Sequence, residues 1–192
     1  MRMHILVAAT IQISWLVFLV YWFVAAFRVN RMRQRERPAR RIFYLLLIAI
    51  SLVLFNADPR YFGPLNGRFV HRGFWVALAG MMLTVAGIAF AIWARNHIGR
   101  FWSGSVAIRE DHRLIRSGPY SRIRHPIYTG VLVALAGTTL AVGNYRALLA
   151  FVLVLVSLIY KARLEEALLT REFGPAFDDH RRHTGFFLPR LS

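Results

Sequence analysis

Long apolar runs constrain this chain more than any other feature of its sequence. The first run, residues 4–27, reads HILVAATIQISWLVFLVYWFVAAF and contains no Asp, Glu, Lys or Arg. A helix of about 20 apolar residues spans the roughly 30 Å hydrocarbon core of a bilayer. Four further runs follow at 42–57, 74–94, 127–142 and 145–160. The sequence therefore predicts an all-α integral membrane protein with about five transmembrane helices.

Other interpretations stay open for the first of these runs and for the last two. A secretory signal peptide is the alternative for the first run, but its apolar stretch exceeds the usual 7–15 residues of such signals. The block RVNRMRQRERPARR, residues 28–41, also stands where a cleavage site would fall. The last two runs would each be about 24 Å long as helices, which is short for a full crossing. Three interpretations stay open: the helices extend beyond these limits, the hairpin thins the bilayer, or it crosses only part of the bilayer.

The distribution of basic residues predicts the orientation. The net charge of +16 could indicate a nucleic-acid-binding protein, but 57% of the residues are hydrophobic. If 28–41, 95–126 and 161–192 share one side, that side holds 20 of the 25 Lys and Arg residues. By the positive-inside rule, this side is cytoplasmic. We expect an outside N-terminus, a cytoplasmic C-terminus, a bacterial inner-membrane location and no nucleic-acid partner.

Small residues predict how the helices pack. They recur every three or four positions in two runs, as Ala77, Gly80, Thr84, Gly87 and Ala91, and as Gly130, Ala134, Gly137 and Ala141. In lipid, close approach over small residues carries much of helix association. We expect both stripes to face other helices of the same chain. The alternative is that Ala and Gly are simply frequent in this sequence.

The chain divides into two regions by composition. Residues 1–94 form an N-terminal three-helix transmembrane region. Residues 95–192 contain a polar loop, a helical hairpin over 127–160 and a polar tail. The absence of cysteine excludes disulfides, thiolate zinc sites and a cysteine nucleophile.

A group of acidic and histidine side chains in the tail could suggest a metal site. The group comprises Asp178, Asp179, His180 and His183. We interpret these residues as four exposed, solvated groups on an amphipathic tail. No metal site is predicted.

The stretch RSGPYSRIRHPIYTG places many polar groups just before the fourth run. Pro126 can occupy the first turn of that helix, and Gly118 can take a positive φ in a turn. Arg122, Arg124 and His125 then gather at the helix N-terminus, where the dipole favours anions. On these residues alone two interpretations stay open: an anion-binding site, or arginines that snorkel to the bilayer interface.

The pattern GPYSRIRHPIYTG, followed by a hairpin, RLEEALLTREFGPAFDDH and FFLP, resembles the isoprenylcysteine carboxyl methyltransferase family and its bacterial relatives. The resemblance covers roughly residues 93–189. It implies an integral membrane fold with a small cytoplasmic cofactor-binding region over the last helical hairpin. It also implies S-adenosylmethionine as the methyl donor. The GxGxxG turn of soluble methyltransferases does not occur in the chain.

The resemblance implies site residues as well. The amino-acid part of S-adenosylmethionine would meet His125, Tyr128 and one glutamate of the Glu165–Glu166 pair. The adenosine part would lie against the backbone from Leu114 to Tyr120. The candidate cofactor-binding residues are Leu114, Gly118, Pro119, Tyr120, Arg124, His125, Pro126, Tyr128, Gly130, Glu165 and Glu166.

The chemistry of the donor suits these residue types. Its carboxylate matches Arg124, His125 and a helix N-terminus, and its ammonium matches Glu165 or Glu166. The hairpin would bring both groups of residues to the same membrane face. Adjacent acids at such an interface are costly unless they are paired. The alternative is a surface pair of glutamates beside neighbouring arginines.

The candidate catalytic residues are Arg163 and Glu166. The expected acceptor is a lipophilic small molecule or a prenylated protein within the membrane lipid, with a carboxylate as the methylated group. A carboxylate is ionised at pH 7 and needs no general base, so the task is alignment and exclusion of water. Arg163 could hold such an anion by a bidentate contact. A thiol or amine acceptor would instead need His125 or a glutamate as base.

Two positions depart from the family pattern, and two other functions stay open. Where the family's tail has two tyrosines three residues apart, this chain has Phe177 and His180. An NADPH-dependent sterol or isoprenoid reductase is the first alternative, since such enzymes share a similar RHP segment. They place an Arg-Asp-Glu cluster where this chain has RLEE. A non-enzymatic membrane component is the second alternative, because no residue of the sequence stands out as a catalytic nucleophile.

Overall fold

The structure is a computed structural model. It describes residues 2–26, 32–35, 38–56, 58–99, 107–109 and 114–190. Parts of the arginine-rich block 28–41 and of the polar loop 95–126 therefore lie outside the described residues. The predictions that rest on those parts are not tested by the structure.

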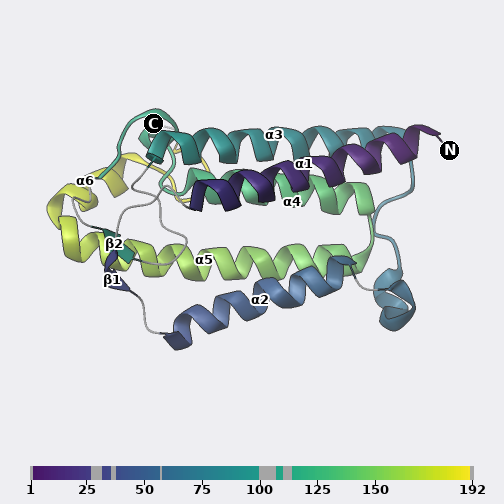
Figure 1. The fold of residues 1–192 in the computed structure, drawn as a ribbon, viewed down its shortest axis with the longest axis horizontal. Helices are drawn as coiled ribbons and strands as arrows, with labels where there is room; N and C mark the ends of the chain where they lie inside the picture. Colours follow the sequence, from purple (N-terminus) through teal and green to yellow (C-terminus); the bar gives the residue numbers. More distant parts are fainter. Residues whose placement is uncertain are drawn as a thin grey trace.

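Five long helices run along the long axis of the molecule (Figure 1). They are α1 (Arg2–Ala26), α2 (Pro38–Asn56), α3 (Phe74–Ile98), α4 (Pro126–Val142) and α5 (Tyr145–Phe173). In length and composition, α1, α2, α3 and α5 could each cross a membrane, whereas α4 is a shorter apolar helix. Many large apolar side chains of α1 and α2 are exposed, as expected for surfaces that face lipid. The predicted all-α membrane fold is confirmed.

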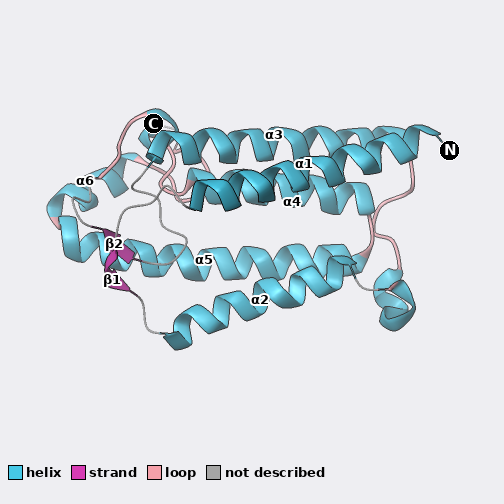
Figure 2. Ribbon diagram, in the orientation of Figure 1, coloured by secondary structure: helices cyan, strands magenta, loops and turns pink. Residues whose placement is uncertain are grey.

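Shorter elements lie at the two ends of the bundle. The 3-10 helix η1 (Pro59–Asn66) lies at the same end as the N-terminus. At the other end are α6 (Pro175–His183) and the antiparallel strands β1 (Met32–Arg35) and β2 (Ala107–Arg109) (Figure 2). The termini therefore lie at opposite ends, as an odd number of crossings requires. The small sheet was not predicted, because MRQR and AIR lack a recognisable strand pattern.

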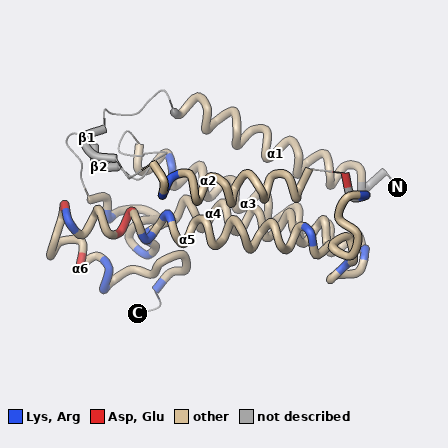
Figure 3. Tube along the Cα trace, turned by 90° about the horizontal axis from the view of Figure 1, so that it is seen from below, with Lys and Arg blue, Asp and Glu red and all other residues tan. Residues whose placement is uncertain are grey.

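Among the described residues, charged residues lie near the two ends of the bundle, and the middle of the helices has none (Figure 3). This separation is what a bilayer requires, because charge is costly within the hydrocarbon core. It supports an integral membrane protein. The orientation of the ends and the division between residues 94 and 95 stay predictions.

The two stripes of small residues pack against each other. A Cβ atom added to Gly80 of α3 would lie 2.5 Å from the carbonyl oxygen of Gly137 in α4, and the reverse distance is also 2.5 Å. One added to Gly130 would lie 2.6 Å from the backbone nitrogen of Ala91. The two helices thus meet backbone to backbone. The prediction that the stripes face other helices of the same chain is confirmed.

The structure gives the limits of the two helices in the last hairpin, whereas the extent to which the hairpin crosses the bilayer stays a prediction. Helix α5 continues beyond residue 160 to Phe173, so it is longer than its apolar run. Helix α4 begins at Pro126, as predicted, and ends at Val142, and the next residue, Gly143, takes the left-handed conformation with φ 69°. Glu165 and Glu166 therefore belong to the same continuous helix as the apolar part of α5.

Candidate active site

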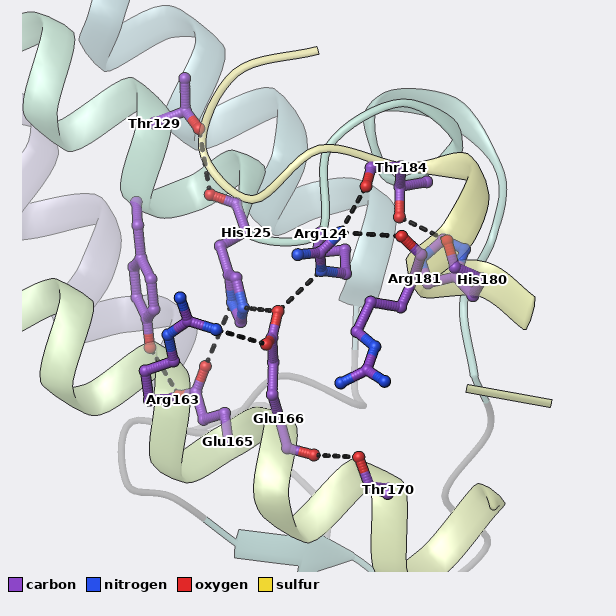
Figure 4. Close-up of polar contacts among 11 residues, drawn as sticks. Arg124, His125, Thr129, Arg163, Glu165, Glu166, Thr170, His180, Arg181 and Thr184 are labelled. Atoms are coloured by element: carbon purple, nitrogen blue, oxygen red, sulfur yellow. Dashed lines mark hydrogen bonds and ion pairs between the residues drawn. The ribbon is translucent and has the colours of Figure 1, made fainter. Parts of the chain in front are cut away.

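The ionic cluster lies where the N-terminus of α4 meets the last third of α5 (Figure 4). Pro126 starts α4, so His125 becomes its N-cap residue and Tyr128 lies within its first turn. Glu165 and Glu166 project from α5 towards these side chains. We call Arg124, His125, Tyr128, Glu165 and Glu166 the carboxylate cluster.

Glu166 is held by three cationic side chains. Its Oε1 accepts a hydrogen bond from Arg124 Nε at 2.6 Å and lies 3.3 Å from His125 Nε2. Its Oε2 lies 3.7 Å from Arg163 Nη1. The Glu166 side chain is only 8% exposed, whereas that of Arg163 is 68% exposed. A buried carboxylate needs such partners, because desolvation of an unpaired charge is costly.

Glu165 has a different set of partners. The Tyr128 hydroxyl donates to its Oε1 at 2.5 Å, and His125 Nδ1 lies 3.6 Å from its Oε2. Lys161 Nζ, one turn earlier on α5, lies 4.0 Å from Oε1. The His125 and Tyr128 rings stack with an interplanar angle of 5°. His125 thus lies between the two carboxylates and fixes their spacing.

A segment after α6 closes one side of the cluster. Its backbone bonds to the residues before α4: Arg124 N donates to Gly185 O at 2.9 Å, and His125 N donates to Phe186 O at 3.3 Å. The Phe186 ring lies 5.7 Å from Arg124 Cζ and 4.7 Å from Arg163 Cζ. Residues 184–187, here called the tail strap, therefore cover the cluster with two aromatic rings.

The structure brings some of the predicted residues together and separates others. Arg124, His125, Tyr128, Glu165 and Glu166 form one cluster, with Arg163 at its exposed rim. Pro126 is buried at the start of α4. Gly130 lies in the contact between α3 and α4 and not in the cluster.

The residues predicted to lie along the adenosine form a neighbouring loop. Leu114 is half-buried, and the 3-10 helix η3 (Gly118–Ser121) follows, with Pro119 and Tyr120 buried. Gly118 has φ 57°, as its predicted turn requires. Burial, together with the charge of Glu165, raises the pKa of Tyr120. The charge of Glu165 therefore acts on Tyr120, so this loop lies near the carboxylate cluster.

One of the four tail residues that were predicted to be exposed differs from the prediction. His180 is buried and not exposed, and burial together with Arg116 and Arg124 lowers its pKa. Asp178 pairs with Arg181 at 3.2 Å, and Asp179 pairs with Arg116 at 3.0 Å. Within the described ranges, no set of three His, Asp or Glu side chains could hold a metal ion. The acids of the tail therefore serve as ion-pair partners.

Two parts of the site were missed by sequence reasoning. The first is Lys161 with Tyr44 of α2, whose ring lies 5.6 Å from the Lys161 ammonium. The second is the tail strap, although its FFLP sequence is part of the family resemblance. The only sequence signal for the contact of Lys161 with Tyr44 is Lys161 itself. It is the one lysine in the chain, and it follows an apolar run directly.

The electrostatics of the cluster favour a protonated His125. Burial by itself lowers the pKa of His125, but the hydrogen bonds and charges of Glu165 and Glu166 outweigh burial and raise it. A raised pKa in the folded state stabilises the fold below the ordinary histidine pKa of about 6.5. This contribution is lost as the pH rises through the raised value.

We therefore expect the melting temperature to fall as the pH rises from about 6.5 through the raised pKa of His125. The variant His125→Gln should lose this dependence, because glutamine does not titrate. Thermal unfolding in one detergent, measured at intervals between about pH 6 and pH 9, compares the two proteins. Parallel curves for the parent and the variant would show that His125 is not the titrating group.

The cluster fits the amino-acid part of S-adenosylmethionine. Arg124 and His125 can bind a carboxylate, and Glu165 and Glu166 can bind an ammonium group. In the structure these groups pair with one another. A zwitterion that inserts among them would exchange each partner for an equivalent one, so no buried charge is left unpaired.

The fold and the cluster together define a helical membrane protein with a buried ionic site at one end of its last hairpin. Residues 78–171 match the sequence model of the isoprenylcysteine carboxyl methyltransferase (ICMT) family. The resemblance to this family that the sequence indicated is therefore confirmed over about half of the chain.

Comparisons with individual proteins agree with this match. Nickel-cobalt-cadmium resistance protein NccN of Alcaligenes xylosoxydans xylosoxydans is 35% identical over 121 residues, 62% of this chain and 54% of that protein. Protein-S-isoprenylcysteine O-methyltransferase of Schizosaccharomyces pombe is 33% identical over 96 residues, 48% of this chain and 41% of that enzyme. The chain thus spans about half the length, or less, of these curated relatives.

A solved structure supports the fold. The eukaryotic intramembrane Ras methyltransferase ICMT superposes with a TM-score of 0.55 and 24% sequence identity. The superposition covers 76% of this chain and 52% of that protein. The shared feature is therefore the helical membrane fold.

Proposed function

We propose that this protein transfers a methyl group from S-adenosylmethionine to a carboxylate of a lipophilic acceptor at the membrane surface. The observation that carries the proposal is the carboxylate cluster, in which two glutamates of α5 meet His125 and Tyr128 of the α4 entrance. The match of residues 78–171 to the ICMT family model supports methyl transfer as the reaction.

Each part of the cluster has a role in binding the donor. Arg124 and His125 bind its carboxylate, and Glu165 or Glu166 binds its ammonium group. The loop from Leu114 to Tyr120 holds its adenosine part. When bound, S-adenosylmethionine supplies an electrophilic methyl group on a sulfonium.

The remaining task of the protein is to align the acceptor carboxylate with the methyl group of the donor. No residue has to remove a proton from the acceptor, because a carboxylate is already ionised at pH 7. The cluster fixes the direction of approach, and the rings of Phe186 and Phe187 in the tail strap exclude water. Arg163 reaches the cluster from the exposed side and is a candidate contact for the acceptor.

The membrane setting narrows the acceptor. The apolar helices place the cluster at the end of a bundle whose sides face lipid, so an acceptor with a hydrocarbon tail can approach within the bilayer. The name of the Schizosaccharomyces pombe relative refers to an isoprenylcysteine acceptor. We propose a prenylated or isoprenoid-like acid as the acceptor, at the cytoplasmic face of a bacterial inner membrane.

Ligand-dependent thermal unfolding of the full chain in detergent tests this proposal against its alternatives. S-adenosylhomocysteine should raise the melting temperature, because a ligand that binds only the folded state stabilises it. A shift with NADPH alone would indicate a reductase. No shift with either ligand at millimolar concentration would contradict the proposal and leave a non-enzymatic membrane component.

A further inference from the structure

His97 is an exposed histidine in the last turn of α3. It is not a member of the carboxylate cluster, yet its ring lies against the loop that is proposed to hold the adenosine of the donor. A basic residue in the last turn of a helix also suits the helix dipole. The dipole does not explain why the ring faces this loop, so His97 calls for a further explanation.

The imidazole contacts the loop in three ways. His97 Nε2 and Ser117 Oγ lie 2.9 Å apart, within hydrogen-bonding distance. A Cβ atom added to Gly118 would lie 2.5 Å from His97 Cε1, so the ring rests on the backbone of the loop. The rings of His97 and Tyr120 are stacked with an interplanar angle of 24°, and their centroids are 6.3 Å apart. The three contacts together hold residues 117–120 against the end of α3.

The loop needs such support, because little regular structure holds it. The 3-10 helix η3 contains only four residues, and Gly118 has φ 57°. Nearly one turn before His97, the carbonyl oxygen of Ala94 accepts a hydrogen bond from the Tyr120 hydroxyl at 3.4 Å. The end of α3 therefore contacts the loop both at Ser117 and at Tyr120.

A loop that is already held in its binding conformation loses less conformational freedom when a ligand binds. Preorganisation of this kind increases affinity, because the cost of ordering the loop is avoided. His97 is exposed, so its removal takes little packing from the helical bundle. Loss of His97 should therefore affect the loop much more than the fold.

We infer that His97 is a positioning residue for the methyl donor and holds residues 117–120 in the conformation that binds adenosine. The inference rests on the proposed function, because that function assigns the adenosine to this loop. His97 acts through its contacts with Ser117, Gly118 and Tyr120. The donor site then includes the end of α3, whereas the residues predicted from the sequence begin at Leu114.

Two ligands separate the two parts of the donor site. S-adenosylhomocysteine carries both the adenosine and the amino acid, whereas 5′-methylthioadenosine carries the adenosine without the amino acid. Each ligand is titrated calorimetrically into the full chain in detergent. His97→Ala should weaken both ligands by the same factor of about three to ten, as the loss of one hydrogen bond would. His97→Gln, which keeps a hydrogen-bonding group at the end of the side chain, should retain most of the affinity.

Three further variants serve as controls. His71→Ala changes an exposed histidine just before the opposite end of α3 and should bind both ligands as the parent does. Glu166→Gln should weaken S-adenosylhomocysteine but not 5′-methylthioadenosine, because it alters only the contacts to the amino acid. Ser117→Ala should cause little further loss when it is added to His97→Ala, because residues that act through one contact are not additive.

Each contrary result has its own meaning. Parental affinity of His97→Ala for both ligands would overturn the inference and leave the proposed function standing. The inference would also fall if His97→Ala weakened S-adenosylhomocysteine alone, or if its effect and that of Ser117→Ala were fully additive. A large fall in the melting temperature of the ligand-free His97→Ala and His97→Gln proteins would show a structural role instead.

The parent protein separates the inference from the proposed function. If it binds S-adenosylhomocysteine but not 5′-methylthioadenosine at millimolar concentration, the loop does not hold the adenosine and the inference falls alone. If it binds neither ligand, the proposed function falls and the inference falls with it.

Discussion

Replacement of Glu166 by glutamine should lower the affinity for S-adenosylhomocysteine by about 30-fold or more. Loss of one or two charge-assisted hydrogen bonds, each contributing about 1.5–3 kcal/mol, accounts for an effect of this size. Glutamine keeps the shape of the side chain but cannot pair with an ammonium group. Calorimetric titration in detergent measures the change.

The same substitution should also destabilise the fold. Arg124 and His125 are almost buried and would lose the carboxylate that both of them contact. Removal of one partner from a buried ion pair typically costs about 3–5 kcal/mol. Glu172→Gln, which changes an exposed glutamate of the same helix, is the control and should bind as the parent does. A folded Glu166→Gln protein with parental affinity would remove Glu166 from the donor site.

Replacement of Gly87 by leucine should prevent α3 and α4 from packing. A Cβ atom at this position would lie 2.6 Å from the carbonyl oxygen of Gly130, so even the first added atom forces the backbones apart. Overpacking of a well-filled site typically costs about 1–3 kcal/mol. We expect a cost of about 3 kcal/mol or more, because the carbonyl oxygen of Gly130 belongs to the backbone and cannot move aside by a side-chain rotation.

The neighbouring substitution Ala86→Leu is the matched control. Ala86 lies on the exposed side of the same helix, so its larger side chain extends into the detergent. Unfolding of the three proteins, followed by circular dichroism during titration with a denaturing detergent, compares their stabilities. Equal stability of the Gly87 and Ala86 variants would mean that α3 and α4 do not meet through this seam.

The sequence predicted those parts of the fold that depend on local pattern. The stripes through Gly80 and Gly130 predicted that α3 and α4 each face another helix. Small residues that repeat at the helical period are enough to mark such a contact face in lipid. Pro126 and Gly118 predicted a helix start and a left-handed turn, because each residue restricts or frees its own backbone. The apolar run from residue 145 predicted only part of α5, because charged residues from Lys161 onwards end the run but not the helix.

The parts that sequence reasoning missed depend on contacts between distant residues. Tyr44 and Lys161 are separated by more than half of the chain, and neither position carries a local signal of their contact. His180 is buried on α6, a helix that is joined to a distant segment by the ion pair of Asp179 with Arg116 at 3.0 Å. Periodicity alone suggested an exposed histidine.

The candidate site was predicted in its central members and incompletely at its edges. His125, Tyr128, Glu165 and Glu166 were expected together, and the structure places them within hydrogen-bonding or ion-pair distance. Gly130 was expected at the site because of its place in the motif, but its missing side chain serves the helix seam. A motif thus combines residues for chemistry with residues for packing.

A structure determined experimentally with S-adenosylhomocysteine bound would test the central claim most directly. The account predicts density for the amino-acid part of the ligand among Arg124, His125, Glu165 and Glu166, and density for its adenosine beside the loop that begins at Leu114. Ligand density elsewhere on the protein, with the carboxylate cluster still paired as it is here, would contradict the account.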